Sequence, residues 1–378
     1  MSYDVIIAGS GCAGLSAAYR LAPDHDVLVV DRAGIGEGTS SRASGVITAP
    51  VDYPSLPEWS ANATEFFHEL DGTGTFTWSD RPYVRGVRPE DIEESRTFTE
   101  QDGVRMVDVD EYDEMFDDDA PYTKAVVWED CGYCDVDEFL ATLHKEAINR
   151  GVEFRPDTTV ESVIVEGGTA VGVETTFGEA RADTVVVAAG SATRTLLADV
   201  LPLPFRKFTW NVAYLDAGLP DDYPMGGDSR LGAYWRRTRD DHLLVGVENR
   251  YELEPTTREE EQVVGEKLRS FLADDLPGLL THVEADTDPV RYEVCPMADT
   301  TTPDARGIID APAEGPDDLV VAAGFHGAGV MASDSIGKAV RARVTGEDTP
   351  FPLAPFRLDR FDTRSTDFAF NTLFKSSS

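Results

Sequence analysis

The amino-terminal part of the chain has two short apolar runs, separated by a glycine-rich turn and an Ala- and Leu-rich stretch. The first run, Val5–Ala8, has the length and uniform apolar character of a parallel strand buried on both faces. The second run is Val27–Val30, and the stretch before it has helical spacing. The turn consists of Gly9, Ser10, Gly11, Cys12, Ala13 and Gly14. The pattern predicts a strand, a turn, a helix and a second strand, in that order.

The glycines of this turn have the spacing G-x-G-x-x-G, which binds dinucleotides when a strand precedes it and a helix follows. Gly9 permits a tight turn, Gly11 allows a pyrophosphate to approach the backbone, and Gly14 allows the helix to pack close to the strand. Asp31 ends the second strand, where its carboxylate can accept both ribose hydroxyls of an adenosine and repels a 2′-phosphate. The motif predicts a bound dinucleotide without distinguishing NAD from FAD. The alternative is a structural glycine turn.

The pattern of short buried strands returns farther along the chain. A helix is predicted between Asp135 and Gly151, because Asp135 can cap it, Glu138 stands three positions later and Gly151 can end it. Strands are expected at 152–154, 160–165, 170–176, 182–190, 308–310 and 318–324. A second glycine turn at 325–329 precedes a helix predicted over 330–344.

Two other segments have a different pattern. Residues 51–130 mix strand and helix signals and include a helix over 59–70 with Ser60 as a possible N-cap. From about 205 to 294 polar and apolar residues alternate as in an antiparallel sheet. The clearest elements there are strands at 210–215, 231–236 and 242–247 and a helix at 258–273.

These patterns predict an α/β protein. Its Rossmann-like domain binds the dinucleotide, and a discontinuous second domain is built on a mostly antiparallel sheet. The predicted division assigns 1–50, 135–200 and 300–350 to the first domain, 51–134 and 201–299 to the second, and 351–378 to a C-terminal tail.

The composition is strongly acidic. The 378 residues, enough for two separate cores, include 70 acidic and 33 basic ones, only six of them lysine, for a formal net charge of −37. A field of this sign disfavours nucleic acid and anionic membrane surfaces as partners. With so little lysine, it predicts a protein of high-salt conditions, where self-repulsion is screened. An acidic activation tail is the alternative, but the acidic residues are spread between apolar positions along the whole chain.

The sequence gives little indication of a membrane span, a disulfide framework or a metal site. No apolar run approaches the roughly 18 residues of a membrane span, and the first strand begins at the third residue, which leaves no room for a signal peptide. We therefore expect a cytoplasmic protein without an integral membrane segment. Cys131 and Cys134 form C-x-x-C before a helix, and a structural or coincidental pair is favoured over a catalytic dithiol. No second Cys or His pair nearby completes a zinc site.

The segment after Asp31, residues 32–48, is rich in Gly, Ser and Thr, which suits contact with phosphates and a flavin; a flexible loop is the alternative. Over residues 3–361 the chain resembles the D-amino-acid oxidase-like FAD oxidoreductases, which include sarcosine oxidase, glycine oxidase and D-amino-acid dehydrogenase. The matching blocks, in the family's order, are GSGCAG with Asp31, SSRASGVI, DVDEFL, DTVVVAAGSAT, AYWRRTRDDHLLVGV, TTPDARGIID and DDLVVAAGFHGAGV. The G-D motif usual in FAD enzymes that hydroxylate aromatic compounds was not found.

The resemblance implies an extended FAD with its isoalloxazine between the two domains. It places the pyrophosphate on Ser10–Gly14, the ribose on Asp31, the adenine near Val160 and the pyrimidine edge of the flavin near Phe325–Val330. The helix predicted from Val330 would direct its positive end at that edge and stabilise the anionic reduced flavin. The FAD contacts implied by the other matched positions are Gly9, Arg32, Ser40, Ser41, Arg42, Ser44, Gly45, Val46, Ala189, Gly190, Gly324, Phe325, His326, Gly327, Ala328, Gly329 and Val330.

The family's chemistry implies that the flavin accepts a hydride from the substrate Cα while the protein orients the substrate. A carboxylate-bearing substrate needs a fixed cation, preferably an arginine. Candidate residues of the substrate pocket are Arg236, Arg291, Arg306, Tyr234 and Trp235. On so acidic a protein an arginine can instead be a surface counter-charge. His326, beside the expected flavin, is a further candidate catalytic residue, or a cap of its turn.

The sequence departs from the family at four functional positions. Leu244 stands where sarcosine oxidase has a lysine that helps oxygen react with reduced flavin, and Met331 stands where it has a substrate-binding lysine. Glu248 is the nearest match to a histidine near the substrate, and could pair with a substrate ammonium or act as a base. Cys295 lies two positions from the family's flavin-linked cysteine and near the carboxylate-binding arginine of glycine oxidase. We therefore expect a dehydrogenase with noncovalent FAD.

Three functions are compatible with the sequence. The first, which we favour, is FAD-dependent oxidation of the C–N bond of an amino acid or N-methylated amine, a small-molecule substrate, with an unknown electron acceptor. The second is a 2-hydroxy-acid or glycerol-phosphate dehydrogenase, which needs no group for an ammonium, so Glu248 separates the two. The third is a non-catalytic flavoprotein assembly factor, recognised by FAD that no substrate reduces.

Overall fold

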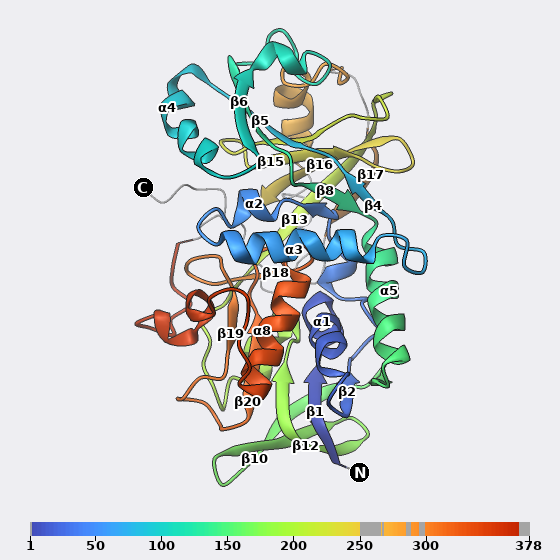
Figure 1. Cartoon of the computed structure of the whole chain (residues 1–378), viewed down its shortest axis with the longest axis vertical. Coiled ribbons are helices and arrows are strands. Elements are labelled where there is room, and N and C mark those ends of the chain that lie inside the picture. The colour runs from blue at the N-terminus through green and yellow to red at the C-terminus, as the bar shows by residue number, and fades with distance from the viewer. Residues whose placement is uncertain (1, 250–265, 267, 285–288, 295–298, 370–378) are drawn as a thin grey trace.

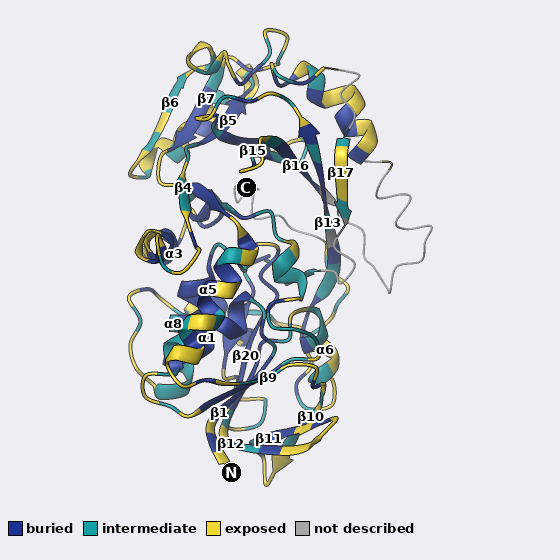
Figure 2. Ribbon diagram, turned by 90° about the vertical axis from the view of Figure 1, so that its right-hand side faces the viewer, coloured by how far each residue is buried: buried dark blue, intermediate teal, exposed yellow. Residues whose placement is uncertain are grey.

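The computed structural model describes residues 2–249, 266, 268–284, 289–294 and 299–369. The described chain forms two large β-sheets and one small sheet. One large sheet lies with most of the helices in the lower half of Figure 1, and the other forms the upper half. The long strand β13 (Arg206–Asp216) runs between the two halves (Figure 2).

The first sheet has eight strands, and its centre is parallel. The order is β10-β11-β12-β1-β2-β9, with β20 paired to β12 and β19 to β20. The strands are β1 (Ser2–Ala8), β2 (Val27–Val30), β9 (Glu153–Arg155), β10 (Val160–Glu166), β11 (Thr169–Thr175), β12 (Gly178–Val187), β19 (Ile308–Asp310) and β20 (Leu319–Ala323). Every residue of β2 is buried, as expected for a strand covered on both faces. The predicted strand, turn, helix and strand at the amino terminus are confirmed.

Three helices cover one side of this sheet (Figure 1): α1 (Cys12–Leu21), α5 (Val136–Asn149) and α8 (Ser333–Thr345). A Cβ atom on Gly14 would lie 1.9 Å from the Gly9 carbonyl oxygen, so only glycine allows α1 to approach β1 this closely. A Cβ on Gly337 would lie 2.6 Å from the carbonyl oxygen of Ser16, so α8 packs as tightly on α1. These contacts fix the position of α1 against the carboxyl end of β1.

The helix starts show one correct and one wrong prediction. The Asp135 carboxylate accepts a hydrogen bond of 3.1 Å from the backbone N–H of Glu138, which confirms it as the N-cap of α5. The predicted helix at 59–70 is α3 (Pro57–Leu70), but Ser60 is not its N-cap. The helix begins earlier because Pro57, with its fixed φ, suits the first turn. The buried Ser60 hydroxyl instead donates to backbone carbonyls, including that of Ala49 at 3.1 Å.

The second sheet has nine described strands, in the order β17-β13-β16-β15-β14-β5-β7-β6, with β18 paired to β13. They are β5 (Tyr83–Val87), β6 (Val104–Asp108), β7 (Lys124–Trp128), β13, β14 (Met225–Asp228), β15 (Ala233–Arg237), β16 (His242–Asn249), β17 (Pro289–Val294) and β18 (Asp299–Thr301). All pairs are antiparallel except β14 with β5. Strands from two distant segments share this sheet, which confirms the discontinuous, mostly antiparallel second domain. The exact domain boundaries remain a prediction.

Short elements connect the two large sheets. A small sheet of β3 (Val46–Ile47), β8 (Gly132–Cys134) and β4 (Trp78–Asp80) lies at the junction with α2 (Ala49–Asp52). The other short α-helices are α4 (Ile92–Ser95) and α6 (Thr193–Leu196). Only the end of the predicted helix at 258–273 is described, where residues 268–270 are helical and Phe271–Asp275 forms a π-helical turn.

The first part of the expected C-terminal tail packs against the first sheet and its helices. Phe351, Phe356 and Leu358 are buried in the hydrophobic cores formed by the first sheet and its helices. Phe356 stacks on Trp59 of α3 with ring centroids 4.2 Å apart. These apolar side chains bury surface that α3 and α8 would otherwise expose. Residues up to at least 358 therefore belong to the folded body and are not a free tail.

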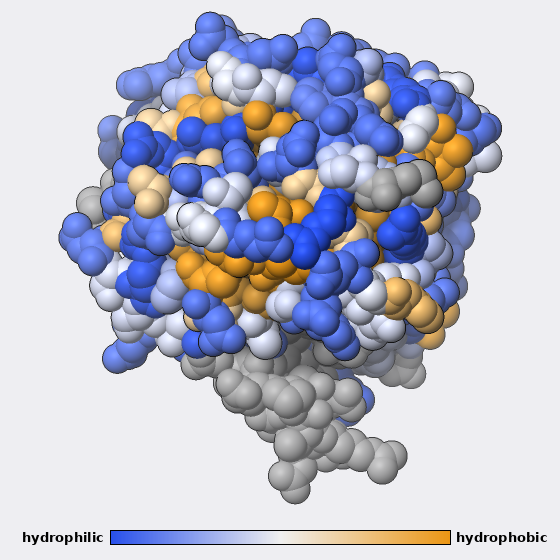
Figure 3. All heavy atoms as spheres, turned by 90° about the horizontal axis from the view of Figure 1, so that it is seen from below, coloured by the Kyte–Doolittle hydropathy of each residue, from blue (hydrophilic) through white to orange (hydrophobic). Residues whose placement is uncertain are grey.

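The end of the molecule seen in Figure 3 is largely hydrophilic. Figure 3 shows polar residues over most of one end of the molecule, with smaller apolar areas between them. Among the described residues, no helix combines the length and the apolar character needed to cross a membrane.

We predict that Asp135→Ala lowers the free energy of unfolding by about 1 kcal/mol, because the amide of Glu138 loses its capping acceptor. Denaturant unfolding at constant salt measures this change. Lys145→Ala, on the exposed side of the same helix, is the control and should change stability by less than about 0.5 kcal/mol. Equal effects of the two substitutions would contradict the capping role.

Candidate functional site

A cavity of about 560 Å³ lies between the first sheet and the second. This is within the range of roughly 300–1,000 Å³ typical of ligand sites. One end is lined by residues at the carboxyl ends of parallel strands: Ala8, Val30, Ala188 and Ala323. The other end is lined by side chains of the second sheet, including Trp210 and Tyr234. In open α/β sheets the carboxyl edge is the usual ligand site.

The glycine turn between β1 and α1 forms the wall at the first end. Gly9, Gly11, Cys12 and Ala13 line the cavity, and α1 directs its amino-terminal end there. Gly9 has a φ of +106°, and a Cβ on it would lie 2.4 Å from the carbonyl oxygen of Ala188. This end offers backbone N–H groups and the positive end of a helix dipole, both suited to an anion.

Asp31 lines the cavity at the end of β2, as predicted, and is held by the turn itself. Its Oδ2 accepts hydrogen bonds from the Ser10 backbone N–H (2.6 Å) and hydroxyl (2.7 Å), and its Oδ1 accepts one from the N–H of Ala33 (3.0 Å). The carboxylate is thus fixed in orientation, and Oδ1 still has lone-pair capacity for a further donor. Ser10 acts behind the wall, since it is fully buried and does not line the cavity.

The Gly- and Ser-rich segment after Asp31 is ordered around the cavity. Its residues Ser40, Arg42, Ser44, Gly45 and Val46 line the wall. The Ser40 hydroxyl accepts a hydrogen bond of 3.0 Å from the N–H of Cys12, which ties the segment to the start of α1. Ser41 is not among the lining residues, and its hydroxyl donates to the Gly38 carbonyl at 3.0 Å.

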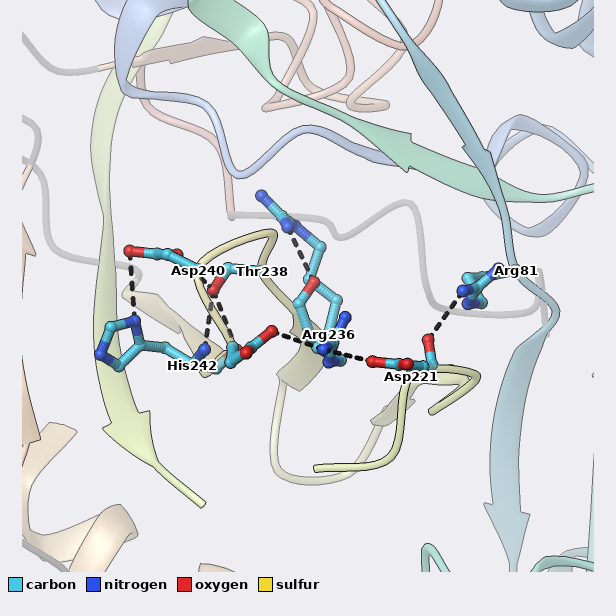
Figure 4. A network of polar contacts seen from close by, with 8 residues as sticks. Arg81, Asp221, Arg236, Thr238, Asp240 and His242 are labelled. Carbon is cyan, nitrogen blue, oxygen red and sulfur yellow. Dashed lines mark hydrogen bonds and ion pairs between the residues drawn. The ribbon is translucent and has the colours of Figure 1, made fainter. Parts of the chain in front are cut away.

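Arg236 holds this segment from the second sheet and does not line the cavity, contrary to the substrate-binding prediction. Its Nε donates to the Ser44 carbonyl at 2.7 Å, and its Nη1 donates to the Arg237 carbonyl at 3.0 Å. Figure 4 shows it in a polar network at the turn after β15, in which the neighbouring Arg237 pairs with Asp221 at 2.8 Å. The guanidinium is buried and lies over the ring of Tyr133. Its contacts indicate a positioning role.

The second glycine turn forms another wall of the cavity. Gly324, Phe325, His326, Gly327 and the three residues that follow all line it. His326 is buried, has a φ of +51° and stacks on Phe208 with ring centroids 4.6 Å apart. A non-glycine residue with positive φ stores strain that is frequent at functional sites. The helix predicted from Val330 begins only at Ser333, after a run of turns, so its end lies farther from this wall than expected.

Strand alternation decides which residues of the second sheet reach the cavity. Trp210, Val212 and Tyr234 line it, whereas Trp235 is fully buried in the core on the opposite face. The prediction that Trp235 lines the pocket is therefore wrong, because consecutive strand residues point to opposite faces. Burial raises the pKa of Tyr234 to about 12, which a hydrogen bond with the Ser44 side chain partly opposes. Tyr234 is neutral at physiological pH and can donate a hydrogen bond.

Three carboxyl groups besides Asp31 line the cavity: Asp52, Glu293 and Asp299. Glu293 is paired with Arg291 at 3.2 Å. Burial raises the pKa of Asp299, which backbone hydrogen bonds from Thr300 and Gly327 partly offset. Burial also raises the pKa of Asp52 to about 7, partly offset by a hydrogen bond from Thr48. These carboxyl groups and the rings of Trp210 and Tyr234 make this part of the cavity wall acidic and aromatic.

The remaining arginine candidates lie outside the cavity lining. Arg306 donates to the Ser55 hydroxyl at 3.2 Å, and Arg291 lies over the ring of Tyr214. Among the described lining residues the arginines are Arg32 and Arg42, both from the segment that follows β2. Glu248 pairs in register with Trp210, but its side chain is outside the described part of the structure. Cys295 also lies outside the described residues.

Most predicted cofactor residues line this one cavity. Those that do are Gly9, Gly11, Cys12, Ala13, Asp31, Arg32, Ser40, Arg42, Ser44, Gly45, Val46, Val160, Ala189, Gly190, Gly324, Phe325, His326, Gly327, Ala328, Gly329 and Val330. Ser10, Gly14 and Ser41 support it from behind. Sequence reasoning missed Asp52, Tyr83, Trp210 and Asp299, which belong to no spaced motif and meet only in the folded chain.

The comparisons with known proteins agree with this geometry. A family model described as "DAO: FAD dependent oxidoreductase" matches residues 4–343. The chain belongs to this family. The DAO-family chain is 25% identical over 385 residues to 4-methylaminobutanoate oxidase (formaldehyde-forming) of Paenarthrobacter nicotinovorans, covering 94% of this chain and 45% of that protein. It therefore spans less than half of that relative's length.

Two further similarities support the family and the fold. Peroxisomal sarcosine oxidase of Mus musculus is 27% identical over 222 residues, covering 54% of each protein. The crystal structure of glycine oxidase from Geobacillus kaustophilus superimposes with a TM-score of 0.79 at 20% identity, covering 96% of this chain and 100% of that one. The α/β fold of this DAO-family chain is thus the fold of a solved member of the named group.

The cysteines of the C-x-x-C pair in this DAO-family chain, Cys131 and Cys134, are both in the described part of the structure. Cys131 and Cys134 are buried in and beside β8, and burial raises the pKa of both thiols. A raised thiol pKa disfavours the thiolate that redox chemistry needs. Among the described residues, no group of three or more His, Cys, Asp or Glu side chains is arranged to hold a metal ion.

We predict that Asp52→Asn changes how stability depends on pH. The folded pKa of Asp52 is about 7 against an ordinary 3.8, so between these values the folded protein keeps a proton that the unfolded chain has lost. Stability of the parent protein therefore falls as pH rises through this window, by at most about 1.4 kcal/mol per pH unit. Asparagine does not titrate, so the variant should gain stability relative to the parent from about pH 4 to 7. Unfolding at several pH values measures this, and a constant difference would contradict the raised pKa.

Proposed function

We propose that this chain binds FAD and oxidises the C–N bond of an amino acid or N-methylated amine. The observation that carries the proposal is the cavity between the two large sheets, in which a dinucleotide-type turn shares the wall with aromatic rings and carboxyl groups. An amine reaches such a site as a cation, to which carboxyl groups and aromatic faces are complementary. The named activity of the 4-methylaminobutanoate oxidase relative supports the same substrate class.

The residues present fit FAD. A Cβ atom on Gly9 or on Gly14 would clash with a backbone carbonyl oxygen. The absence of these atoms lets the turn between β1 and α1 pack closely beneath the dinucleotide-type end of the cavity. The backbone around Gly11 and Cys12 would hold the pyrophosphate, and Asp31 the ribose. The segment from Ser40 to Val46 and the turn from Phe325 to Val330 would hold the flavin.

When bound, FAD supplies the oxidant and takes up the hydrogen of the substrate C–H bond as a hydride. The protein's part is to position the substrate and to set its protonation state. The rings of Trp210 and Tyr234, with centroids 5.8 Å apart, form an apolar wall against which a small substrate can be oriented. Tyr234 keeps its phenolic proton and can donate it in a hydrogen bond. The carboxyl groups of Asp52 and Asp299, when ionised, are complementary to the positive charge of an amine.

A dehydrogenase is favoured over an oxidase. Leu244, at the position matched to the lysine that assists oxygen in sarcosine oxidase, is almost fully buried in β16 and provides no cation. Met331, at the position matched to a substrate-binding lysine, lines the cavity with an apolar side chain. Without these cations, electrons would pass to an acceptor other than oxygen. Net charge and low lysine content support function at high salt.

The test is a visible spectrum of the protein purified in molar KCl, before and after acid precipitation. Anaerobic additions of D- and L-amino acids, sarcosine, N-methylated amines and 2-hydroxy acids follow. Flavin in the supernatant that an amine bleaches would support the proposal and noncovalent attachment. Absence of flavin would overturn it. Bleaching only by 2-hydroxy acids would indicate the hydroxy-acid dehydrogenase, and flavin that nothing reduces would indicate the assembly factor.

We predict that Gly9→Ala reduces both stability and flavin content. Alanine at a φ of +106° is strained, and its Cβ would meet the Ala188 carbonyl oxygen at 2.4 Å. Strain of this kind costs about 1–3 kcal/mol. The flavin-to-protein absorbance ratio and the thermal midpoint measure the two effects. Gly278→Ala is the control, because a Cβ there has no neighbour within 4 Å, and equal losses in both variants would contradict the role of Gly9.

A further inference from the structure

Asp52 is a buried carboxyl group in the cavity wall. It is the last residue of α2, between the small sheet and α3, and its exposed fraction is 4%. Thr48 and Tyr83 line the cavity beside it. The Thr48 hydroxyl donates a hydrogen bond of 2.7 Å to its Oδ2. A hydroxyl can rotate, so Thr48 can serve Asp52 in both protonation states.

The surroundings of Asp52 do not neutralise it by direct contact. Within the described residues, no Lys, Arg or His nitrogen lies within 4.0 Å of its carboxyl oxygens. Arg85 of β5 lowers its pKa from a distance, with its guanidinium over the ring of Trp128. The other titratable groups facing it are Tyr53, Tyr83 and Cys131, and burial keeps all three protonated by raising their pKa values.

The other carboxyl groups of the cavity have partners that occupy them. Asp31 accepts three hydrogen bonds at the nucleotide-type end. Glu293 is paired with Arg291 at 3.2 Å. Asp299 accepts hydrogen bonds from the backbone N–H groups of Thr300 and Gly327, so its oxygens are occupied, although burial still raises its pKa. Among the described residues, the side chain of Asp52 has one hydrogen-bond partner, the Thr48 hydroxyl, which can rotate to donate or accept. Asp52 is therefore the carboxyl group suited to gain and lose a proton.

Amine oxidation needs such a group. An alkylamine arrives as an ammonium ion, since ordinary amine pKa values are about 10. Its nitrogen has no lone pair until a proton leaves, and without a lone pair it cannot form the C=N bond of the product. A base is most effective when its pKa lies near the working pH, and the pKa of Asp52 is about 7.

We propose that Asp52 binds the substrate ammonium and accepts one of its protons. In this step an N–H bond of the ammonium breaks, the proton forms an O–H bond with the Asp52 carboxylate, and the electron pair stays on nitrogen. The proton passes to solvent after product release. This inference rests on the proposed function, because it assigns a catalytic residue to the same oxidation.

The test is anaerobic rapid mixing of the FAD-loaded protein with N-methylbutylamine and with 4-methylaminobutanoate between pH 5.5 and 9. In the parent protein the second-order rate constant for flavin reduction should fall on the acid side, with an apparent pKa near 7. In Asp52→Asn this rate constant at pH 7 should fall about 10²–10³-fold. The fall of the rate constant on the acid side of the pH profile, the acid limb, should also disappear in this variant, while its flavin content stays unchanged.

Two further variants complete the test. Thr48→Val removes the hydrogen bond that favours the ionised form, so the limb should move to higher pH even if Asp52→Asn folds poorly. Asp310→Asn is the control, a buried carboxyl outside the cavity lining that accepts a hydrogen bond from the Leu358 N–H at 2.8 Å, and its rates should equal those of the parent. Asp52→Asn reacting within threefold of the parent, with the same acid limb, would overturn the inference. A parent protein whose bound flavin no amine reduces would instead overturn the proposed function, and this inference with it.

Discussion

The close contact between β1 and α1 is the constraint on which the rest of the structure depends. Gly9 and Gly14 bring the backbone of the turn so near to its neighbours that a Cβ on Gly14 would lie 1.9 Å from a carbonyl oxygen. The amino-terminal end of α1 therefore stands at the carboxyl edge of the parallel strands. Asp31 joins that edge from β2 and is locked there by Ser10. Helix dipole, free N–H groups and carboxylate converge on one end of the cavity.

The other end of the cavity depends on strand alternation in the second sheet. Trp210 and Tyr234 reach the cavity, whereas Trp235 contributes to the core on the far face. The same strands thus contribute both to a stable core and to a ligand wall. Carboxyl groups placed there are costly to bury in the ionised form. The raised pKa values of Asp52 and Asp299 result from this cost, and a cationic substrate would relieve it.

Contacts between distant segments hold the two ends together. Arg236 of β15 donates to the Ser44 carbonyl, which fixes the segment after β2 against the second sheet. The N–H of His326 donates to the Thr300 carbonyl at 3.0 Å, which joins the second glycine turn to β18. The strained backbone of His326 is maintained by these surroundings and by stacking on Phe208. The cavity therefore depends on both sheets being in place.

The sequence by itself determined the parts that rest on local spacing. The glycine turn, the buried strands beside it, the Asp135 cap and the discontinuous order of the segments follow from patterns within short stretches, and the structure confirms them. Tertiary structure alone decided which side chains outside those motifs share the cavity. Asp52 and Asp299 line the cavity but belong to no motif. Arg236 was predicted to bind a substrate carboxylate because of its charge, but its side chain donates to the Ser44 carbonyl. The physical reason is that backbone propensity acts over a few neighbouring residues. Burial, ion pairing and the face of a strand depend on partners that only folding brings near.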